Sequence, residues 1–221
     1  IWQISTGYFG CRTQDGKFDE NQFAEKAKLS QVKMIEIKLS QGAKPGHGGM
    51  LLGPKVSPEI AETRNVPAFE DVISPHKHSE FSTPGELLKF VQKLRDLSKG
   101  KPVGIKICIG HPWEFIAIIK AIVQTDIYVD FITVDGSEGG TGAAPVEFTD
   151  HLGSPLRDAV VFVDNALIGA GLRDRIKVAA SGKIVSAYDI VRVCAIGADW
   201  CKVFHHSTEY LMITTLIQPT I

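Results

Sequence analysis

The chain has 221 residues, of which 44% are hydrophobic and 22% are charged, and its formal net charge is -1. This length can bury a sizeable core in one large or two small domains, and the composition is that of a globular protein. The balanced charge argues against binding to nucleic acid, and each apolar stretch is interrupted well before the ~18 residues of a membrane span. No signal peptide or targeting sequence can be read at the start, Ile1-Trp2-Gln3-Ile4.

The four cysteines include no C-x-x-C pair; they are Cys11, Cys108, Cys194 and Cys201. This pattern predicts a reducing compartment, taken here as the cytoplasm, and argues against a disulfide framework and a zinc site. The seven histidines also lack the spacing of metal ligands. We therefore predict no metal site.

The first third of the chain contains few regular elements. We predict strands over residues 1–5 and 32–39 and a helix over residues 18–29. A glycine-rich stretch at 41–50 opens a long loop that continues to about Pro75, with one short helix near 57–63. A loop of this length is uncommon in a compact domain unless it is functional, so we expect a functional role here.

From Ser82 onward, helices and strands alternate. Ser82 or Thr83 caps a helix with an apolar face, and three more helices are predicted over 112–123, 156–170 and 186–196. Strands are predicted over 103–109, 131–134, 176–180 and 198–203.

This alternation predicts an α/β fold with parallel strands and right-handed crossovers. A TIM-type (β/α) barrel and an open doubly wound sheet would both produce it. We count five or six strands where a barrel needs eight. The prediction is therefore an incomplete barrel that lacks its N-terminal strands and its C-terminal end.

The loop after the strand at 131–134 is the clearest sign of a binding site. It contains two carboxylates, Asp135 and Glu138, and four glycines within seven positions: Gly136, Gly139, Gly140 and Gly142. Glycine allows a ligand to lie directly against the backbone, so the loop favours a phosphate or a flat ring as its ligand. A tight turn that binds nothing is the alternative.

Lys106 lies near the carboxyl end of an otherwise apolar strand. A buried lysine is costly unless it has an anionic partner or lies at the mouth of the fold. Two roles are therefore open. Lys106 contacts the ring of a flavin, whose reduced anion it would stabilise, or it forms an ion pair with Asp135 or Glu138.

Three further cations stand in loops. The run Ser181-Gly182-Lys183 falls between a strand and a helix, where backbone amides bind phosphate, although Ser181 could simply cap the helix. Lys44 and Arg64 lie in or near the long loop. They could hold a dicarboxylate, or they could be solvated surface charges.

Several motifs together resemble the FMN-binding synthase domain of glutamate synthase, and more closely the shorter related proteins without an amidotransferase domain. They occur in the family's order; from the first to the last they are Gly7–Cys11, Lys44–Gly49, Ile109–Phe115, Gly139–Ala144 and Ser181–Lys183. The resemblance covers residues 1–201, which we predict to form a partial barrel domain. Residues 202–221 are predicted to be a divergent tail.

The resemblance implies a flavin-containing TIM-type barrel that converts 2-oxoglutarate and ammonia, free or derived from glutamine, to 2-iminoglutarate and then L-glutamate. Reduced FMN would deliver the hydride, and an electron donor would reduce the FMN. Lys106 and Glu138 would be catalytic. FMN would contact Lys106, Gly139, Gly140, Thr141, Gly142, Ser181, Gly182 and Lys183, and the substrate would contact Lys44, Arg64 and Ser82.

The sequence also departs from the family pattern. Met50 stands where the full-length enzymes have glutamine, and His47 stands where they have an acidic residue. The family's iron–sulfur cluster needs cysteines after Cys201, and this sequence contains none. The alternatives to a glutamate synthase are therefore an FMN barrel that acts on another substrate and a non-catalytic truncated fragment.

Overall fold

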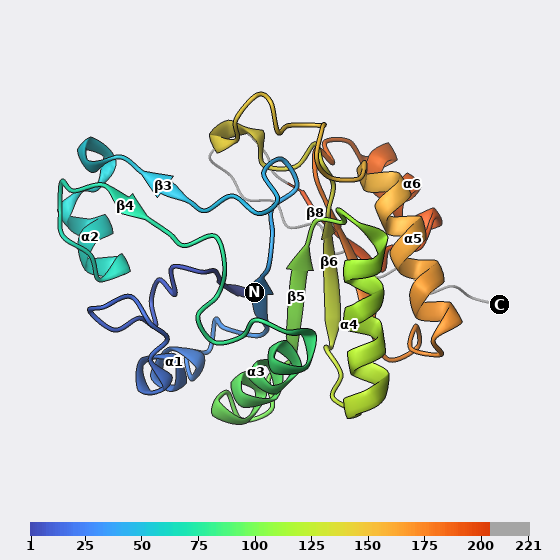
Figure 1. Ribbon diagram of the computed structural model, residues 1–221, viewed down its shortest axis with the longest axis horizontal. Coiled ribbons are helices and arrows are strands. Elements are labelled where there is room, and N and C mark those ends of the chain that lie inside the picture. Colours follow the sequence, from blue (N-terminus) through green and yellow to red (C-terminus); the bar gives the residue numbers. More distant parts are fainter. Residues whose placement is uncertain (204–221) are drawn as a thin grey trace. The chain divides into compact units, whose positions relative to one another are not determined.

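The structure is a computed structural model that describes residues 1–203 (Figure 1). The chain divides into two compact units. The first unit contains Ile1–Leu39 and Gly46–Gly104, and the second contains Ser40–Pro45 and the residues from Ile105 onward.

The first unit contains a parallel strand pair and two packed helices. Strand β1 (Trp2–Ile4) pairs with β2 (Ile35–Lys38), in register from Trp2 opposite Ile35. Helix α1 (Glu20–Ala27) packs against α3 (Pro84–Leu97). Helix α3 begins in a capping box, in which Thr83 accepts from the Glu86 N–H and Glu86 accepts from the Thr83 N–H. This confirms Thr83 as the cap.

The long loop of the first unit has more structure than the sequence predicted. Helix α2 (Pro58–Arg64) confirms the predicted short helix. A short antiparallel pair, β3 (Met50–Leu51) with β4 (Val72–Ile73), and a single 3₁₀ turn (Gly53–Lys55) were not predicted. They surround a small apolar cluster of Val56, Ala61 and Val72. Strands of two residues are too short to show the alternation from which strands are predicted.

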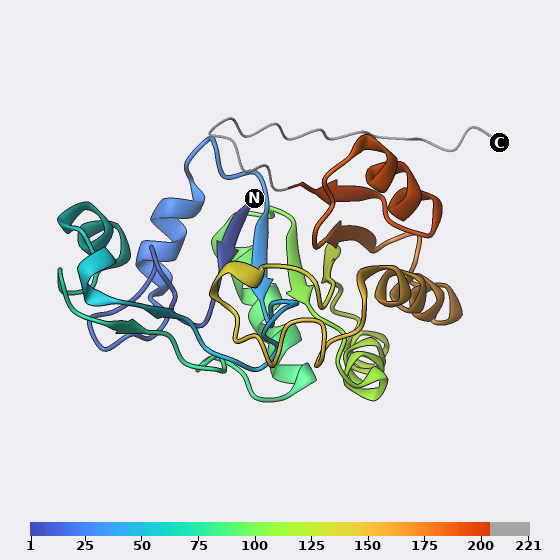
Figure 2. The ribbon, with the colours of Figure 1, turned by 90° about the horizontal axis from the view of Figure 1, so that it is seen from above.

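The second unit is a parallel sheet with helices along one side (Figure 2). Its strands lie in chain order: β5 (Val103–Ile107, of which the first two residues belong to the first unit), β6 (Phe131–Asp135), β7 (Lys177–Ser181) and β8 (Trp200–Lys202). The helices that connect them are α4 (Pro112–Thr125), α5 (Leu156–Gly169) and α6 (Ala187–Ala195). The predicted α/β fold with parallel strands is confirmed.

Strand register determines what meets at the carboxyl edge of this sheet. Lys106 of β5 lies opposite Thr133 of β6, and Asp135 at the end of β6 lies opposite Ser181 at the end of β7. The two central strands, β5 and β6, are buried almost throughout, whereas β8 is only partly buried. The loops that follow β5, β6 and β7 therefore start from one rigid edge, where function is expected in folds of this class.

No helix within residues 1–203 is both long enough and apolar enough to cross a membrane.

Candidate functional site

The central feature of the carboxyl edge is a buried ion pair. Lys106 Nζ lies 3.1 Å from Asp135 Oδ2, and the two side chains are 14% and 2% exposed. The same carboxylate oxygen accepts the backbone N–H of Gly42 at 2.8 Å. The ion pair considered from the sequence is thus present. Because an ammonium group has three N–H donors, Lys106 still has donors available for a ligand.

Close packing within the protein explains most of the glycines in the loop after β6. A Cβ atom on Gly139 would lie 2.6 Å from Asp135 Oδ1, and one on Gly140 would lie 2.2 Å from Gln41 Nε2. A Cβ atom on Gly136 would lie 2.6 Å from Leu156 Cβ. Packing requires glycine at 136 and 139, and the positive φ of 76° favours it at 140, whether or not a ligand binds. Gly142 differs, because nothing lies within 4 Å of its Cβ position.

The segment Ser40–Pro45 is hydrogen bonded to the loop after β6. Ala43 N–H donates to Gly139 O at 2.8 Å, and Gln41 Nε2 donates to Gly140 O at 2.7 Å. At Gly42 a Cβ atom would lie only 1.6 Å from Gly136 O. The segment Ser40–Pro45 and the loop after β6 therefore pack together closely. Lys44, which lies in this segment, has only 8% of its surface exposed. Lys44 is not a solvated surface charge.

Glu138 has a structural partner. Its carboxylate accepts the backbone N–H of Leu156, the first residue of α5, at 3.1 and 3.2 Å. The preceding residue, Pro155, provides no side-chain cap. A carboxylate at a helix N-terminus satisfies an otherwise unpaired N–H and interacts favourably with the helix dipole. Glu138 thus caps α5, while its catalytic role stays a prediction.

The region after β7 differs from the predicted arrangement. The possible role of Ser181 as the cap of the next helix is wrong, because Ser181 is the last residue of β7 and its carbonyl accepts from Gly136 N–H at 2.9 Å. The cap of α6 is Ser186, which forms a capping box with Asp189. Gly182 and Lys183 lie between strand and helix with positive φ angles of 126° and 44°.

The other two predicted substrate contacts, Arg64 and Ser82, belong to the first unit. Arg64 lies in the last turn of α2 with its guanidinium over the ring of Phe9, 4.8 Å from the centroid. Ser82 donates its N–H and its hydroxyl to Glu86 at 2.8 and 2.9 Å. Ser82 therefore contributes to the capping of α3, and its contact with substrate stays a prediction.

Cys108 is a buried thiol of the second unit. Burial raises the pKa of this thiol to about 12, and the negative charges of Asp135 and Glu138 add to the effect. A thiol that stays protonated at neutral pH is a poor nucleophile. Among the residues that the structure describes, no cluster of His, Cys, Asp and Glu could hold a metal ion. The raised pKa of Cys108 therefore argues against its use as a nucleophile.

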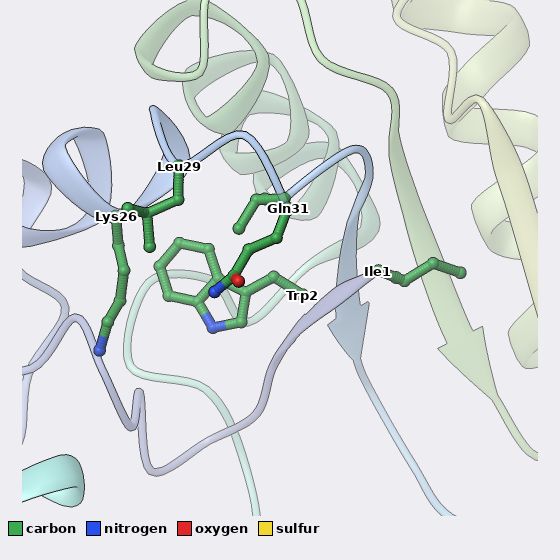
Figure 3. Close-up of a pocket in the computed structure, with 6 residues that line it drawn as sticks. Ile1, Trp2, Lys26, Leu29 and Gln31 are labelled. Atoms are coloured by element: carbon green, nitrogen blue, oxygen red, sulfur yellow. The ribbon is translucent and has the colours of Figure 1, made fainter. Parts of the chain in front are cut away.

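A pocket of about 270 Å³ opens in the first unit at the amino ends of β1 and β2 (Figure 3). It is lined by Ile1, Trp2, Lys26, Leu29, Gln31 and Val32. Because parallel α/β folds place their chemistry at the carboxyl ends of strands, this pocket is on the wrong side of β1 and β2 for an active site. The pocket is therefore not part of the candidate site.

The comparison with known families decides the chain's membership. The sequence pattern described as the conserved region in glutamate synthase matches residues 1–214. The chain belongs to the glutamate synthase family. The match extends into the predicted tail at 202–221, of which the residues from 204 lie outside the described part, so the predicted boundary at 201 stays a prediction.

Curated relatives support this membership. The chain is 43% identical over 203 residues to the glutamate synthase large subunit-like protein YerD of Bacillus subtilis, covering 92% of this chain and 38% of YerD. It is 38% identical over 200 residues to the archaeal glutamate synthase [NADPH] of Methanocaldococcus jannaschii, covering 90% and 36%. The chain thus spans a little over a third of the length of these relatives.

Solved structures identify the fold. Two mutant forms of flavocytochrome b2, one with benzoylformate and one with pyruvate bound, match with TM-scores of 0.53 and 0.51. They are 14% and 15% identical, and each match covers 90% of this chain and 41% of the other. At this identity the likeness concerns the fold alone. It confirms the prediction of an incomplete TIM-type barrel.

Proposed function

We propose that this glutamate synthase family chain forms part of a cytoplasmic, FMN-dependent oxidoreductase that aminates 2-oxoglutarate to L-glutamate through 2-iminoglutarate. The observation that carries the proposal is the buried Lys106–Asp135 pair at the carboxyl edge of the parallel strands. A fixed cation at this edge is suited to the reduced, anionic form of a flavin. Family membership supplies the reaction class.

The backbone after β7 fits a phosphate group. Gly182 and Lys183 both have positive φ, and among residues 1–203 their N–H groups have no hydrogen-bond partner. Adjacent N–H groups that no protein acceptor takes up, in the turn between a strand and a helix, can bind an anion. The strain of a non-glycine residue at φ 44° is also typical of functional positions. The exposed side chain of Lys183 adds a positive charge. These features support Gly182 and Lys183 as the FMN phosphate site.

When bound, FMN supplies hydride transfer to the imine carbon. The residues of the chain divide the remaining tasks. The Gly42 N–H holds the Asp135 carboxylate, which in turn fixes Lys106, and Lys106 would present its positive charge to the cofactor. The open backbone at Gly142, where a Cβ atom would meet nothing within 4 Å, leaves space for a ring. Lys44, Arg64 and Ser82 would bind the carboxylates of 2-oxoglutarate.

Two partners are expected beyond the substrate. Ammonia is needed for imine formation, either free or released from glutamine. The names of the archaeal relatives contain NADPH, and we infer that a nicotinamide is also the electron donor here. An iron–sulfur cluster is not part of the proposal.

Flavin binding tests the proposal. Purified protein is titrated with FMN and, separately, with riboflavin, which lacks the phosphate, and flavin fluorescence is followed. We expect FMN to bind at least tenfold more tightly, and Lys183→Ala to lower the affinity for FMN but not for riboflavin. Lys120→Ala, which removes an exposed lysine of α4, is the matched control. Protein that carries no flavin absorption after saturation with FMN and removal of the unbound FMN by gel filtration would contradict the proposal and favour a non-catalytic chain.

A further inference from the structure

Two of the four free cysteines lie on neighbouring elements of the second unit. Cys194 is in the last turn of α6, and Cys201 is the middle residue of β8. Helix α6 packs against β8 (Figure 2). Both cysteines are partly exposed, whereas Cys11 and Cys108 are buried. The pair on α6 and β8 is therefore the one that a small reagent in solution can reach.

The alternation of side chains along β8 places Cys201 on the face away from the candidate site. The ring of Trp200 packs on that of Phe131, with the centroids 5.6 Å apart. Phe131 shares its face of β6 with Asp135, because side chains four residues apart on a strand point the same way. Trp200 therefore lies on the Asp135 side of the sheet, and Cys201, the next residue, lies on the other.

Cys194 faces this side of the sheet from α6. It follows Ile190 by four residues, so both lie on one face of the helix. Ile190 is only 9% exposed, which shows that this face is packed. The Cys194 side chain is hydrogen bonded to that of Cys201. Burial raises the pKa of the Cys201 thiol to about 12, and the contact with Cys194 adds to this effect. The two thiols are direct neighbours.

The turn that joins the two cysteines is held in place. Gly197 N–H donates to Cys194 O at 3.2 Å, and Asp199 N–H donates to Val178 O at 2.7 Å. The carboxylate of Asp199 accepts the Val178 N–H at 2.7 Å and lies 2.9 Å from Arg173 Nη2. Because these contacts already fix the backbone, joining the two side chains would cost little further conformational entropy.

From these features we propose that Cys194 and Cys201 form a reversible dithiol site, which a low-molecular-weight disulfide such as oxidised glutathione converts to an intramolecular disulfide. The thiolate of one cysteine attacks a sulfur of oxidised glutathione, and one glutathione thiolate leaves. The other cysteine, also as a thiolate, then attacks the protein sulfur of this mixed disulfide, and the second glutathione leaves. The protein loses two electrons and two protons, which reduce the oxidised glutathione to two glutathione thiols.

Mass spectrometry of protein equilibrated with oxidised and reduced glutathione tests this site. Free thiols are blocked with N-ethylmaleimide, and trypsin, which cuts after Arg192 and Lys202, releases residues 193–202 as one peptide that carries both cysteines. We expect an unblocked peptide that is lighter by two hydrogens than its reduced form. The ratio of this internal disulfide to the glutathione mixed disulfide should be at least about tenfold higher in native than in urea-unfolded protein, because the fold holds the thiols together.

Variants check that the two cysteines act on each other. Cys194→Ser and Cys201→Ser should each give only the mixed disulfide at the remaining cysteine. The matched control is Cys11→Ser, which removes a buried thiol of the first unit and should leave the disulfide unchanged. An excess of reduced glutathione should return the wild-type pair to thiols.

Two results would overturn the inference. One is a ratio of internal to mixed disulfide that is equal in native and urea-unfolded wild-type protein, since the fold would then contribute nothing. The other is a native peptide that stays fully reduced in a buffer that oxidises the unfolded chain. Both results come from the wild-type protein, so they do not depend on the folding of any variant.

Discussion

The two compact units hold their cations in different ways. In the second unit, Lys106 is paired with the nearly inaccessible carboxylate of Asp135, which also accepts from Gly42. In the first unit, Arg12 and Arg64 rest on the ring of Phe9 and have no carboxylate partner among residues 1–203. One cation is fixed by a permanent counter-charge, and the other two are fixed by an aromatic surface.

This difference indicates different tasks. A lysine with a permanent partner keeps its position and charge whether or not a ligand is present, which suits a cofactor that stays bound. Guanidinium groups with unused donors are suited to an anion that enters and leaves, because nothing in the protein must be displaced first. Under the proposed function, Lys106 would serve the flavin and Arg64 would contact the substrate.

The largest expected change in stability comes from removing the negative charge of Asp135. Asp135→Asn leaves the buried Lys106 ammonium without its ion pair, and the free energy of unfolding should fall by about 3–5 kcal/mol in urea denaturation. The double variant with Lys106→Met should recover much of this loss. Asp15→Asn, which removes an exposed partner of Lys17, is the control and should not change stability measurably. If Asp135→Asn and Asp15→Asn lowered the free energy of unfolding equally, Lys106 would not depend on a buried counter-charge, and the contrast between the two units would be wrong.

Alanine at Gly42, which is closely packed, and alanine at Gly142, which is not, should have different effects on the second unit. Gly42→Ala would drive a Cβ atom into the Gly136 carbonyl, and we expect it to lower the free energy of unfolding by about 3 kcal/mol or more. Gly142→Ala meets nothing within 4 Å and should leave stability nearly unchanged while weakening FMN binding. Thermal unfolding and FMN titration of both variants check this contrast. A Gly42→Ala protein as stable as wild type would show that Ser40–Pro45 and the loop after β6 are not closely packed.

A smaller, pH-dependent effect is expected in the first unit. Burial lowers the pKa of His78 below its ordinary value of 6.5, so the native state holds this imidazole neutral. As the pH falls below 6.5, the unfolded chain binds the proton first, and the stability of the fold should decrease. Urea midpoints between pH 7 and pH 5 measure the decrease, which should be smaller in His78→Gln. The neighbouring exposed His76→Gln should behave like wild type.

Much of the fold could be predicted from the sequence, because the pattern was long and regular. The helices and strands from Pro84 to Lys202 lie close to their predicted ranges, since apolar periodicity and capping residues mark them. The strands at Met50 and Val72 could not be predicted, because two residues show no period. The alternative of Ser181 as a helix cap failed because Ser186 and Asp189, five and eight residues on, form the capping box.

The site could be predicted only in part. Lys106 was found because a lysine in an apolar strand is unusual, and its partner Asp135 was foreseen as one of two choices. The glycines at Gly139 and Gly140 suggested a ligand, but the structure shows that they accommodate neighbouring protein atoms. Such information exists only in three dimensions.

The central claim concerns the reaction itself. Purified protein loaded with FMN is mixed with 2-oxoglutarate and isotope-labelled ammonium, the flavin is reduced chemically, and labelled L-glutamate is quantified. The account predicts that glutamate forms with the wild-type protein and that its rate falls at least about a hundredfold in Lys106→Met. FMN-loaded protein that forms no glutamate above the level of free reduced FMN would contradict the account.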